Sequence, residues 1–294
     1  MSQVESRSVE GIYRPPAHHW VGNGFHVLGY FSAIPQAMRR LDPFLMLDYH
    51  PAEVYSPTQT PRGVGVHPHR GFETVTLAWQ GEVAHHDSTG AGGIIGPGDV
   101  QWMTAARGIL HKEYHAAAWA AKGGPFQMAQ LWVNLPRAHK MDPPGYQALT
   151  AGQMGRVALP NDGGEVRVIA GRFQDAVGPA RTHTPLGVYD IRLRAGGTVT
   201  FDLPPSWNAG LLVMEGTVTL GDGRAAQQHD FVVYGHTGSQ LTLTATRDAQ
   251  LLLLTGEPIQ EPIAHYGPFV MNTEGELRQA VRDLQAGAFG HLAD

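Results

Sequence analysis

Two pairs of possible metal ligands are the residues best suited to chemistry in this chain. The first pair is His67 and His69, and the second is His111 and Glu113; the members of each pair lie two positions apart in strand-like sequence. Side chains two apart on a strand share one face. If the two segments are neighbours in a small barrel, three imidazoles and one carboxylate converge inside it. The pattern predicts a mononuclear 3-His/1-Glu site with one or two positions left for solvent or substrate.

The context of the two pairs distinguishes them from chance, because the chain has 16 histidines. His18-His19 and His85-His86 are chance pairs in our interpretation, and we expect them to be loop or surface residues. A turn signal, Arg70-Gly71, follows the first candidate pair, and Arg107-Gly108 leads into the second. Each of these turn signals lies beside an apolar run, which favours a specific metal site over a chance pair of residues.

Composition limits the other possibilities. At 294 residues with 42% hydrophobic content, the chain is long enough for two domains with real cores. It has no cysteine, so disulfides, thiolate ligands and thiol nucleophiles are excluded, and any metal must bind to histidine and carboxylate. A net charge of -5 with 21 Lys and Arg argues against a nucleic-acid footprint.

The first 25 residues lack the basic and apolar regions of a secretory signal, and no apolar run reaches 18 residues. We therefore expect a cytoplasmic protein that does not bind a membrane and is a monomer. Its protein partners, if any, stay open.

Short alternating segments separated by Gly, Pro and Asp turns predict an all-β fold built as a sandwich or barrel. The segment E-T-V-T-L-A-W at 73–79 is one example, and the same pattern returns after residue 145. The Pro-rich stretch at 137–144 is the expected linker. The predicted domains are 1–136, which binds the metal, and 145–294, which does not.

The two halves also align as a weak internal repeat. The alignments place four residues of the second half opposite the four candidate ligands: Asp202, Pro204, Thr242 and Thr244. None of them suits a tight metal site, so we expect the second half to have the barrel without the metal.

One clear helix is predicted near the end of the chain. Thr273 and Glu276 form a capping box, and Leu277, Val281 and Leu284 form a stripe at helical spacing. We interpret the stripe as a packing face rather than a partner-binding face.

Several longer motifs resemble the pirin family of bicupins over nearly the whole chain. They are H-P-H-R-G-F-E-T-V-T at 67–76, P-G-D-V-Q-W-M-T-A-A-R-G-I-L-H-K-E at 97–113, L-W-V-N-L-P at 131–136 and P-I-A-H-Y-G-P-F-V-M-N-T at 262–273. The resemblance implies two jelly-roll cupin barrels with metal in the N-terminal one. By position it assigns ligand roles to His67, His69, His111 and Glu113.

A second assignment of the carboxylate stays open. In the general cupin pattern the carboxylate ligand comes four residues after the second histidine, and Glu73 occupies that place. The second general cupin motif fails here, because Trp102 stands near the expected histidine and His111 comes later. We therefore prefer Glu113 and expect Glu73 to be a strand carboxylate bound to polar neighbours.

Imidazole and carboxylate suit Fe, Mn, Ni, Co, Cu or Zn, and the resemblance implies one Fe(II). It also implies a quercetin 2,3-dioxygenase-type enzyme that acts on a planar polyphenol and dioxygen. We expect Glu113 to serve as both ligand and general base for the flavonol 3-hydroxyl. The main alternative is an iron-binding, redox-sensing regulatory or protein-binding module; a cupin isomerase is a third.

Overall fold

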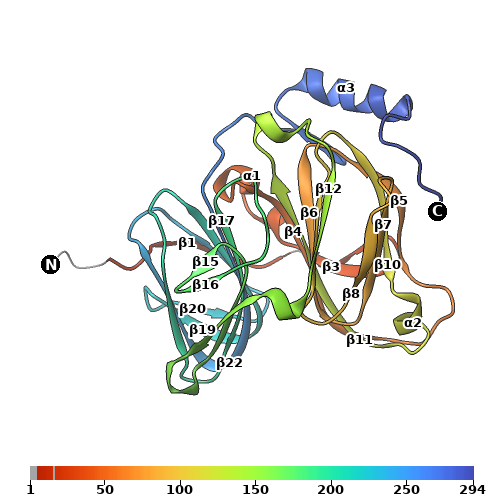
Figure 1. The fold of residues 1–294 in the computed structure, drawn as a ribbon. Coiled ribbons are helices and arrows are strands. Elements are labelled where there is room, and N and C mark those ends of the chain that lie inside the picture. The colour runs from red at the N-terminus through yellow and green to blue at the C-terminus, as the bar shows by residue number, and fades with distance from the viewer. Residues whose placement is uncertain (1–4, 16) are drawn as a thin grey trace. The chain divides into compact units, whose positions relative to one another are not determined.

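The computed structural model describes residues 5–15 and 17–294, and their contacts group them into two compact units. Unit 1 contains the described residues up to 15 together with 30–43 and 152–259. Unit 2 contains residues 17–29, 44–151 and 260–294. Both units are built almost entirely from antiparallel strands (Figure 1). The predicted all-β fold class with a short C-terminal helix is therefore confirmed.

Unit 2 has two main sheets. The four-stranded sheet runs in the order β5 (Gly63–His69), β10 (Ile109–His115), β7 (Val83–Asp87) and β8 (Gly92–Ile95). The seven-stranded sheet runs in the order β12 (Gly145–Leu149), β9 (Val100–Thr104), β6 (Phe72–Gln80), β11 (Gly124–Asn134), β4 (Phe44–Tyr55), β3 (Phe25–Gly29) and β2 (His19–Val21). A short helix, α2 (Ala117–Ala120), lies between β10 and β11.

Strand β10 shows how the sequence pattern places its side chains. Its buried residues alternate with partly exposed ones, and the buried set is Ile109, His111, Glu113 and His115. This period of two places the candidate ligands on the interior face of the strand, as the i,i+2 spacing predicts. Strand β6 is different, because nearly all its residues are buried, which is typical of a central strand covered on both faces.

The C-terminal segment belongs to unit 2. Strands β23 (Ala264–Tyr266) and β24 (Phe269–Met271) form a hairpin, and α3 (Glu274–Gln285) follows it. The predicted capping box is confirmed, because Thr273 Oγ1 accepts a hydrogen bond from the Glu276 backbone and the Glu276 carboxylate accepts one from the Thr273 backbone. The apolar stripe packs against Phe269 and Phe289, so it is a packing face.

This C-terminal segment contacts the end of strand β5 at Arg70. The Arg70 backbone exchanges hydrogen bonds with Pro268 and Val270, and the Arg70 guanidinium pairs with Asp283 at 2.7 Å. Gly71 has φ +89°, and a Cβ there would lie 2.0 Å from the Val270 carbonyl oxygen. Arg70 and Gly71 therefore serve the structure by allowing the tail to approach the histidine motif closely.

The predicted consecutive boundaries, 1–136, 137–144 and 145–294, differ from this grouping. Strand β12 pairs with β9 of unit 2, and the tail after residue 260 also joins unit 2. Within the expected linker, residues 137–139 form the short 3-10 turn η2 (Arg137–His139) and Lys140 is buried. Its ammonium group donates to Gly71 O at 2.7 Å, Asn134 Oδ1 at 2.7 Å and Val270 O at 3.0 Å, so this stretch is packed structure.

Unit 1 has one large sheet and a small hairpin. The sheet runs in the order β1 (Val9–Tyr13), β21 (Phe231–Tyr234), β19 (Asn208–Leu220), β22 (Gln240–Gly256), β17 (Leu186–Leu193), β14 (Gly164–Ala170) and β13 (Gly155–Leu159), with β18 (Thr198–Asp202) paired to β22 and β20 (Ala225–Gln227) to β19. The hairpin joins β15 (Arg172–Phe173) and β16 (Ala176–Val177). The remaining elements are η1 (Tyr30–Ala33), α1 (Ala37–Arg40) and η4 (Pro160–Asp162), while η3 (Ala151–Gln153) lies where units 2 and 1 meet along the chain.

The strands of unit 1 repeat those of unit 2 in the way the sequence alignment predicts. Strand β18 pairs with the start of β22, as β5 pairs with β10, and Gly81 and Gly216 have φ values of +80° and +81° at matching turns. The interior of unit 1 is an apolar cluster of leucine, valine, isoleucine and aromatic side chains. Among the described residues of unit 1, no three potential ligands gather in this cluster as they do in unit 2.

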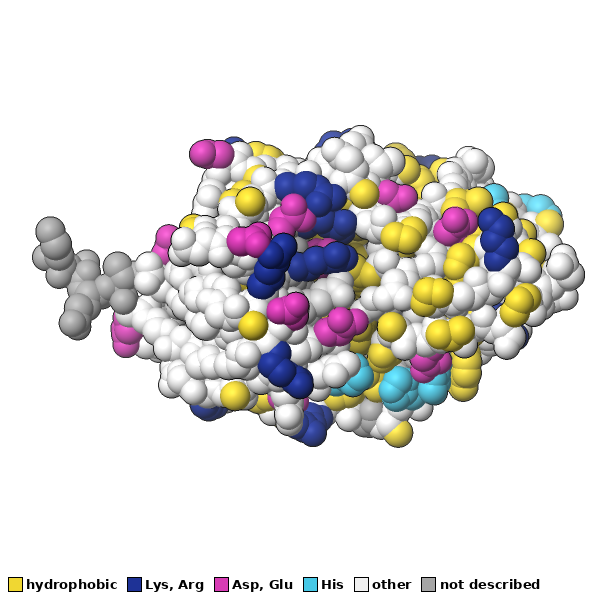
Figure 2. Space-filling view, turned by 90° about the horizontal axis from the view of Figure 1, so that it is seen from below, with side chains coloured by type: hydrophobic (Ala, Val, Ile, Leu, Met, Phe, Trp, Pro, Cys, Tyr) yellow, Lys and Arg dark blue, Asp and Glu magenta, His cyan; other side chains and the backbone are white. Residues whose placement is uncertain are grey.

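Charged side chains of both signs lie close together on the face drawn in Figure 2. The ion pairs of unit 1 include Arg156 with Glu165 at 2.8 Å and Arg224 with Asp222 at 2.8 Å. Such pairs neutralise each other locally and contribute little to stability where they are exposed. Among the described residues, no helix is long and apolar enough to cross a membrane.

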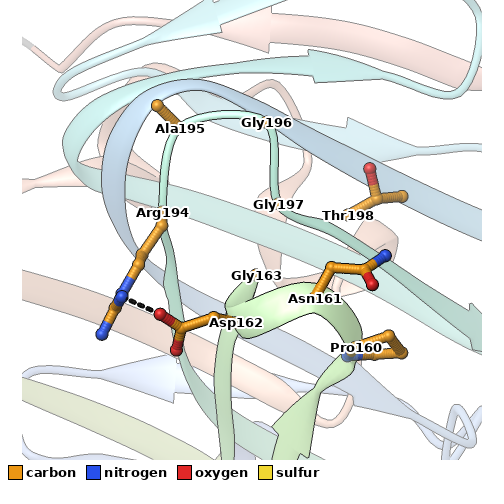
Figure 3. Close-up of a pocket in the computed structure, with 9 residues that line it drawn as sticks. All are labelled: Pro160, Asn161, Asp162, Gly163, Arg194, Ala195, Gly196, Gly197 and Thr198. Carbon is orange, nitrogen blue, oxygen red and sulfur yellow. Dashed lines mark hydrogen bonds and ion pairs between the residues drawn. The ribbon is translucent and has the colours of Figure 1, made fainter.

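Unit 1 also carries a surface cavity of about 580 Å³ between the loops at 160–163 and 194–198 (Figure 3). Asp162 and Arg194 form an exposed ion pair across it, and the other lining residues are small or uncharged. Ligand pockets are usually apolar and enclosed, with a few convergent polar groups. This cavity is open to solvent and its two charged lining residues pair with each other, so it is not our candidate site.

Candidate metal centre

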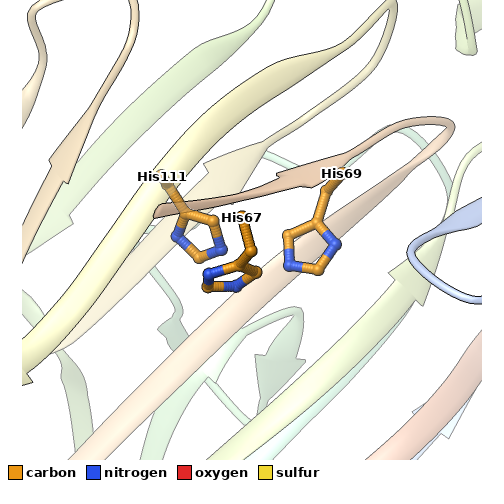
Figure 4. A group of neighbouring side chains, drawn as sticks. All are labelled: His67, His69 and His111. Atoms are coloured by element: carbon orange, nitrogen blue, oxygen red, sulfur yellow. The ribbon is translucent and has the colours of Figure 1, made fainter. Parts of the chain in front are cut away.

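Three histidines from β5 and β10 meet inside unit 2. His67 and His111 are cross-strand partners, and their ring centroids lie 4.2 Å apart. The His69 ring lies 4.9 Å from the His67 ring and 4.8 Å from the His111 ring. Figure 4 shows the three rings pointing toward a common centre. One nitrogen of each ring lies within 4.8 Å of those of the others, a spacing that one ion can bridge.

The hydrogen bonds of these rings leave one nitrogen on each free to bind. His67 Nδ1 donates to Gly65 O at 2.8 Å, so Nε2 faces away from that bond. His69 Nδ1 and His111 Nε2 are buried and have no hydrogen-bond partner. A buried polar atom without a partner costs free energy unless something satisfies it. The donor set therefore fits a transition-metal ion bound by imidazole nitrogens.

Burial also keeps these imidazoles in the form that binds metal. His111 is fully buried and His69 nearly so. Desolvation, reinforced by the neighbouring His67, lowers the pKa of His69 well below its usual value. Desolvation together with the nearby histidines lowers the pKa of His111 in the same way. Both rings are therefore neutral near pH 7, as a metal ligand must be.

Glu113 lies beside His111 but is held by three donors. Its Oε1 accepts from Thr76 Oγ1 at 3.0 Å and from Gln101 Nε2, and its Oε2 accepts from Gln130 Nε2 at 2.6 Å. Its carboxylate groups with His85 and His111, whereas His67 and His69 group with His111 alone. The structure thus brings three predicted ligands together and places the fourth at the edge of the cluster.

The alternative carboxylate, Glu73, has other partners. Its Oε1 accepts a hydrogen bond from Thr104 Oγ1 at 2.7 Å, and its side chain is buried. Glu73 belongs to no grouping of three potential ligand residues in the described part of the chain. This geometry favours Glu113 over Glu73 as the carboxylate near the histidines.

A small cavity of about 30 Å³ opens beside the cluster. His67, Glu113 and Gln130 line its polar side, while Asp48 lies on the neighbouring strand β4 as the cross-strand partner of Gln130. The remaining lining is apolar and comprises Val21, Phe25, Val27, Val64 and Met128. Dioxygen or one water fits such a volume.

Asp48 is a functional candidate that the sequence interpretation missed. Burial raises the pKa of Asp48 to about 6, and the nearby His19 opposes that shift. A carboxyl group with a pKa near neutrality in a cleft is suited to accepting and releasing a proton. The sequence signal was weak, because one aspartate inside the strand F-L-M-L-D-Y-H at 44–50 has no motif around it.

The interpretation of His85-His86 as loop or surface was wrong for His85. His85 is fully buried on β7, whereas His86 is exposed. The alternation of V-A-H-H-D at 83–87 could have revealed this, because it places Val83, His85 and Asp87 on one face. His18 and His19 are exposed, as expected. His18, His26 and Glu53 form a further, more exposed grouping of possible ligands.

In unit 1 the residues opposite the candidate ligands belong to no such cluster among the described residues. Asp202 and Pro204 are exposed, and Thr242 hydrogen-bonds to Thr200 at 3.0 Å, as Thr244 does to Thr198. Among the described residues, no grouping of possible ligands lies wholly within unit 1. The asymmetry between the halves therefore agrees with the repeat alignment.

Two β-barrels with a histidine cluster in one of them define a bicupin with a candidate metal centre. Comparison with known proteins makes the class specific: residues 24–133 match pirin, and residues 188–290 match the pirin C-terminal cupin domain. The chain belongs to the pirin family. The resemblance found in the sequence and the predicted two-cupin fold are both confirmed.

Named relatives span nearly the whole chain. A Pseudomonas aeruginosa protein named "Putative quercetin 2,3-dioxygenase PA2418" is 50% identical over 96% of this chain and 98% of its own length. Pirin of Mus musculus is 37% identical over 84% of this chain and 83% of its own length. A solved structure called quercetin 2,3-dioxygenase from Acinetobacter baumannii has a TM-score of 0.94 at 45% identity, and it covers 98% of this chain and 100% of that one.

Proposed function

We propose that this protein is a metal-dependent dioxygenase that cleaves flavonols such as quercetin. The observation that carries the proposal is the trio of His67, His69 and His111, with two buried nitrogens that have no partner beside a cavity lined by Glu113. The names of the similar proteins support the same reaction class. We further propose Fe(II) as the native ion, a monomer and a cytoplasmic location.

The proposed reaction joins one dioxygen to one flavonol and opens its central ring. Both oxygen atoms enter the ester product, and the carbon that carried the 3-hydroxyl leaves as carbon monoxide. A bound redox-active divalent ion would supply the activation of dioxygen and the binding of an anionic substrate oxygen. His67, His69, His111 and Glu113 are the residues that we propose hold this ion.

The residues of the chain must also remove the proton of the flavonol 3-hydroxyl. We propose Glu113 as both ligand and general base, since it lines the cavity and its carboxylate is oriented by Thr76, Gln101 and Gln130. Asp48 lines the same cavity and is a second candidate for the base. General-base assistance contributes about 10²–10⁴-fold to rate.

The size of the cavity favours a second candidate function. At about 30 Å³ it is far smaller than the roughly 300–1,000 Å³ typical of pockets for drug-sized ligands. A flavonol could bind only after some of the side chains that line the cavity move apart. A protein that binds iron as a redox-sensing regulatory or protein-binding module needs no such movement.

Oxygen consumption with a flavonol separates the two candidates. The protein is purified without oxygen, its metal content is measured, and it is loaded with Fe(II) or, in a parallel sample, Mn(II). The dioxygenase proposal expects loss of quercetin absorbance with one dioxygen consumed and one carbon monoxide released per flavonol, and none of these in His67→Ala. If the fully loaded wild type shows no turnover, the binding-module function replaces the dioxygenase.

A further inference from the structure

Two buried residues next to the candidate metal centre have no role in the function proposed so far. His85 and Asp87 lie on the interior face of β7, directly beside β10. In the register of the two strands His111 is opposite Asp87, and Glu113 is opposite His85. A buried histidine and a buried carboxylate are costly to place in a core, so they call for a physical explanation.

The three side chains form a hydrogen-bonded chain that ends at a candidate ligand. His111 Nδ1 lies 3.3 Å from His85 Nδ1, and His85 Nε2 lies 3.3 Å from Asp87 Oδ2. The other oxygen, Asp87 Oδ1, accepts from the Thr89 backbone at 2.8 Å and from Thr89 Oγ1 at 2.6 Å. The His85 ring stacks on Tyr146 at 5.1 Å with an interplanar angle of 18°. Asp87 and His85 are therefore both fixed in orientation.

The chemistry of these groups determines where the protons lie. Asp87 Oδ1 accepts two hydrogen bonds from Thr89, and Asp87 Oδ2 faces His85 Nε2, so the carboxylate acts as an acceptor on both oxygens. His85 Nε2 must then carry the proton that it donates to Asp87. In a neutral imidazole the other nitrogen is an acceptor, so His85 Nδ1 accepts from His111 Nδ1.

The opposite arrangement is unfavourable. If His85 carried its proton on Nδ1, its Nε2 lone pair would face the Asp87 carboxylate without a proton between them. The chain therefore places the His111 proton on Nδ1 and the lone pair on Nε2, which is the buried nitrogen that has no hydrogen-bond partner. That nitrogen is the one available to a metal ion.

We propose that Asp87 and His85 are positioning residues that fix the tautomer and ring orientation of His111, so that its Nε2 is presented to the metal. The inference rests on the proposed metal site and extends it by two residues. Partners of this kind behind a ligating histidine typically change metal affinity by about 10–100-fold. Their effect is on binding, and it can be measured without any flavonol turnover.

Asp87→Asn is the most direct test. The asparagine amide can donate to His85 Nε2, which reverses both hydrogen bonds and moves the His111 proton onto Nε2, where it blocks the metal. We expect Ni(II) and Co(II) to bind about 10–100-fold more weakly, measured on the full chain without oxygen by competition with a chelator. His86→Gln is the matched control, since His86 is exposed on the same strand, and it should bind as wild type does.

A pair of substitutions at His85 keeps the inference testable if Asp87→Asn folds poorly. His85→Phe retains the stacking on Tyr146 but removes the acceptor for His111, so it should lose affinity. His85→Gln restores an acceptor oxygen and should recover much of it. Imidazole ¹⁵N chemical shifts of the metal-free protein report the tautomer directly, and they should place the His111 proton on Nδ1 in wild type and on Nε2 in Asp87→Asn.

These experiments distinguish a failure of the positioning role from a failure of the proposed metal site. Wild-type affinity in a folded Asp87→Asn, or equal losses in His85→Phe and His85→Gln, would overturn the positioning role. Loss in both His85 variants without loss in Asp87→Asn would instead make His85 a ligand. If wild type and His67→Ala bind Ni(II) equally, the metal site proposed above fails, whatever the His85 and Asp87 variants do.

Discussion

At the scale of single residues, the proposed metal site leaves a choice between Glu113 and Glu73 as its carboxylate ligand. Glu113 forms a group of potential ligands with His85 and His111, whereas Glu73 accepts a hydrogen bond from Thr104. We expect His67→Ala and His111→Ala to abolish stable metal binding and Glu113→Gln to weaken it. Glu73→Gln should retain the metal. Metal analysis after dialysis checks this, and an empty site in Glu73→Gln beside a full one in Glu113→Gln would restore the general cupin arrangement.

The raised pKa of Asp48 predicts that the ionised side chain lowers the stability of the folded protein. Burial raises the pKa of Asp48 from 3.8 to about 6, so the folded state favours the protonated acid. Its stabilising contribution is present below pH 3.8 and is lost as pH rises through 6, a difference of up to about 3 kcal/mol. Asp48→Asn should therefore raise the unfolding free energy of the metal-free protein at pH 8, with little change at pH 4.

Urea unfolding at the two pH values measures this effect, with Asp175→Asn as an exposed control that should change little at either pH. Asp48→Asn should also slow flavonol turnover per bound ion if Asp48 is the base. Full activity in a stabilised Asp48→Asn would leave Glu113 as the base.

At the scale of elements, the hairpin of β2 and β3 limits the cavity. These strands lie at the edge of the seven-stranded sheet, and Val21, Phe25 and Val27 face the cavity from them. Val27→Ala removes buried carbon next to the cavity, at a cost of about 2 kcal/mol in stability. If the cavity restricts the flavonol, kcat/KM for quercetin should rise in this variant. Val54→Ala, on the exposed side of β4, is the control.

The C-terminal helix predicts a coupling between a remote core and the metal site. Leu277 of α3 packs with Phe269 and Phe289. The neighbouring residues Pro268 and Phe269 pair with the backbone of Arg70. The Pro268 backbone also forms a hydrogen bond with the side chain of His69. Leu277→Ala should cost about 2–5 kcal/mol in stability and also weaken metal binding. Unfolding and Ni(II) titration test both effects. The exposed Arg278→Ala should leave both unchanged, and normal metal affinity in Leu277→Ala would separate the helix from the site.

At the scale of the whole molecule, the two barrels share a topology but differ in their interiors. Unit 2 contains the histidine trio, whereas the core of unit 1 is an apolar cluster. Of the matching residues in unit 1, Asp202 and Pro204 are exposed, and Thr242 and Thr244 hydrogen-bond to Thr200 and Thr198. We therefore expect one tightly bound metal per chain. Elemental analysis of the loaded protein measures the ratio, and two tightly bound ions, or one near Asp202 or Thr242, would contradict the asymmetry. If a second ion binds weakly, His26→Gln tests whether it is held by the group of His18, His26 and Glu53, because the substitution should then remove it.

The sequence by itself determined those features that depend on spacing along one strand or helix. Alternation with a period of two predicted the all-β class and placed His67, His69, His111 and Glu113 on interior faces, because side-chain direction in a strand is local. The capping box and apolar stripe predicted α3 for the same reason. The internal repeat predicted which half would contain the histidine cluster, since the residue types at the matching positions can be read directly from the chain.

Only the tertiary structure decided how distant segments combine. The tail from residue 260 joins the unit that contains the first histidine pair, and no local pattern encodes that choice of partner. The burial of His85, the chain from Asp87 through His85 to His111, and the raised pKa of Asp48 depend on strand neighbours and desolvation. Strand periodicity sets which face a side chain occupies, but its partners and its electrostatic environment arise only when separate strands pack together.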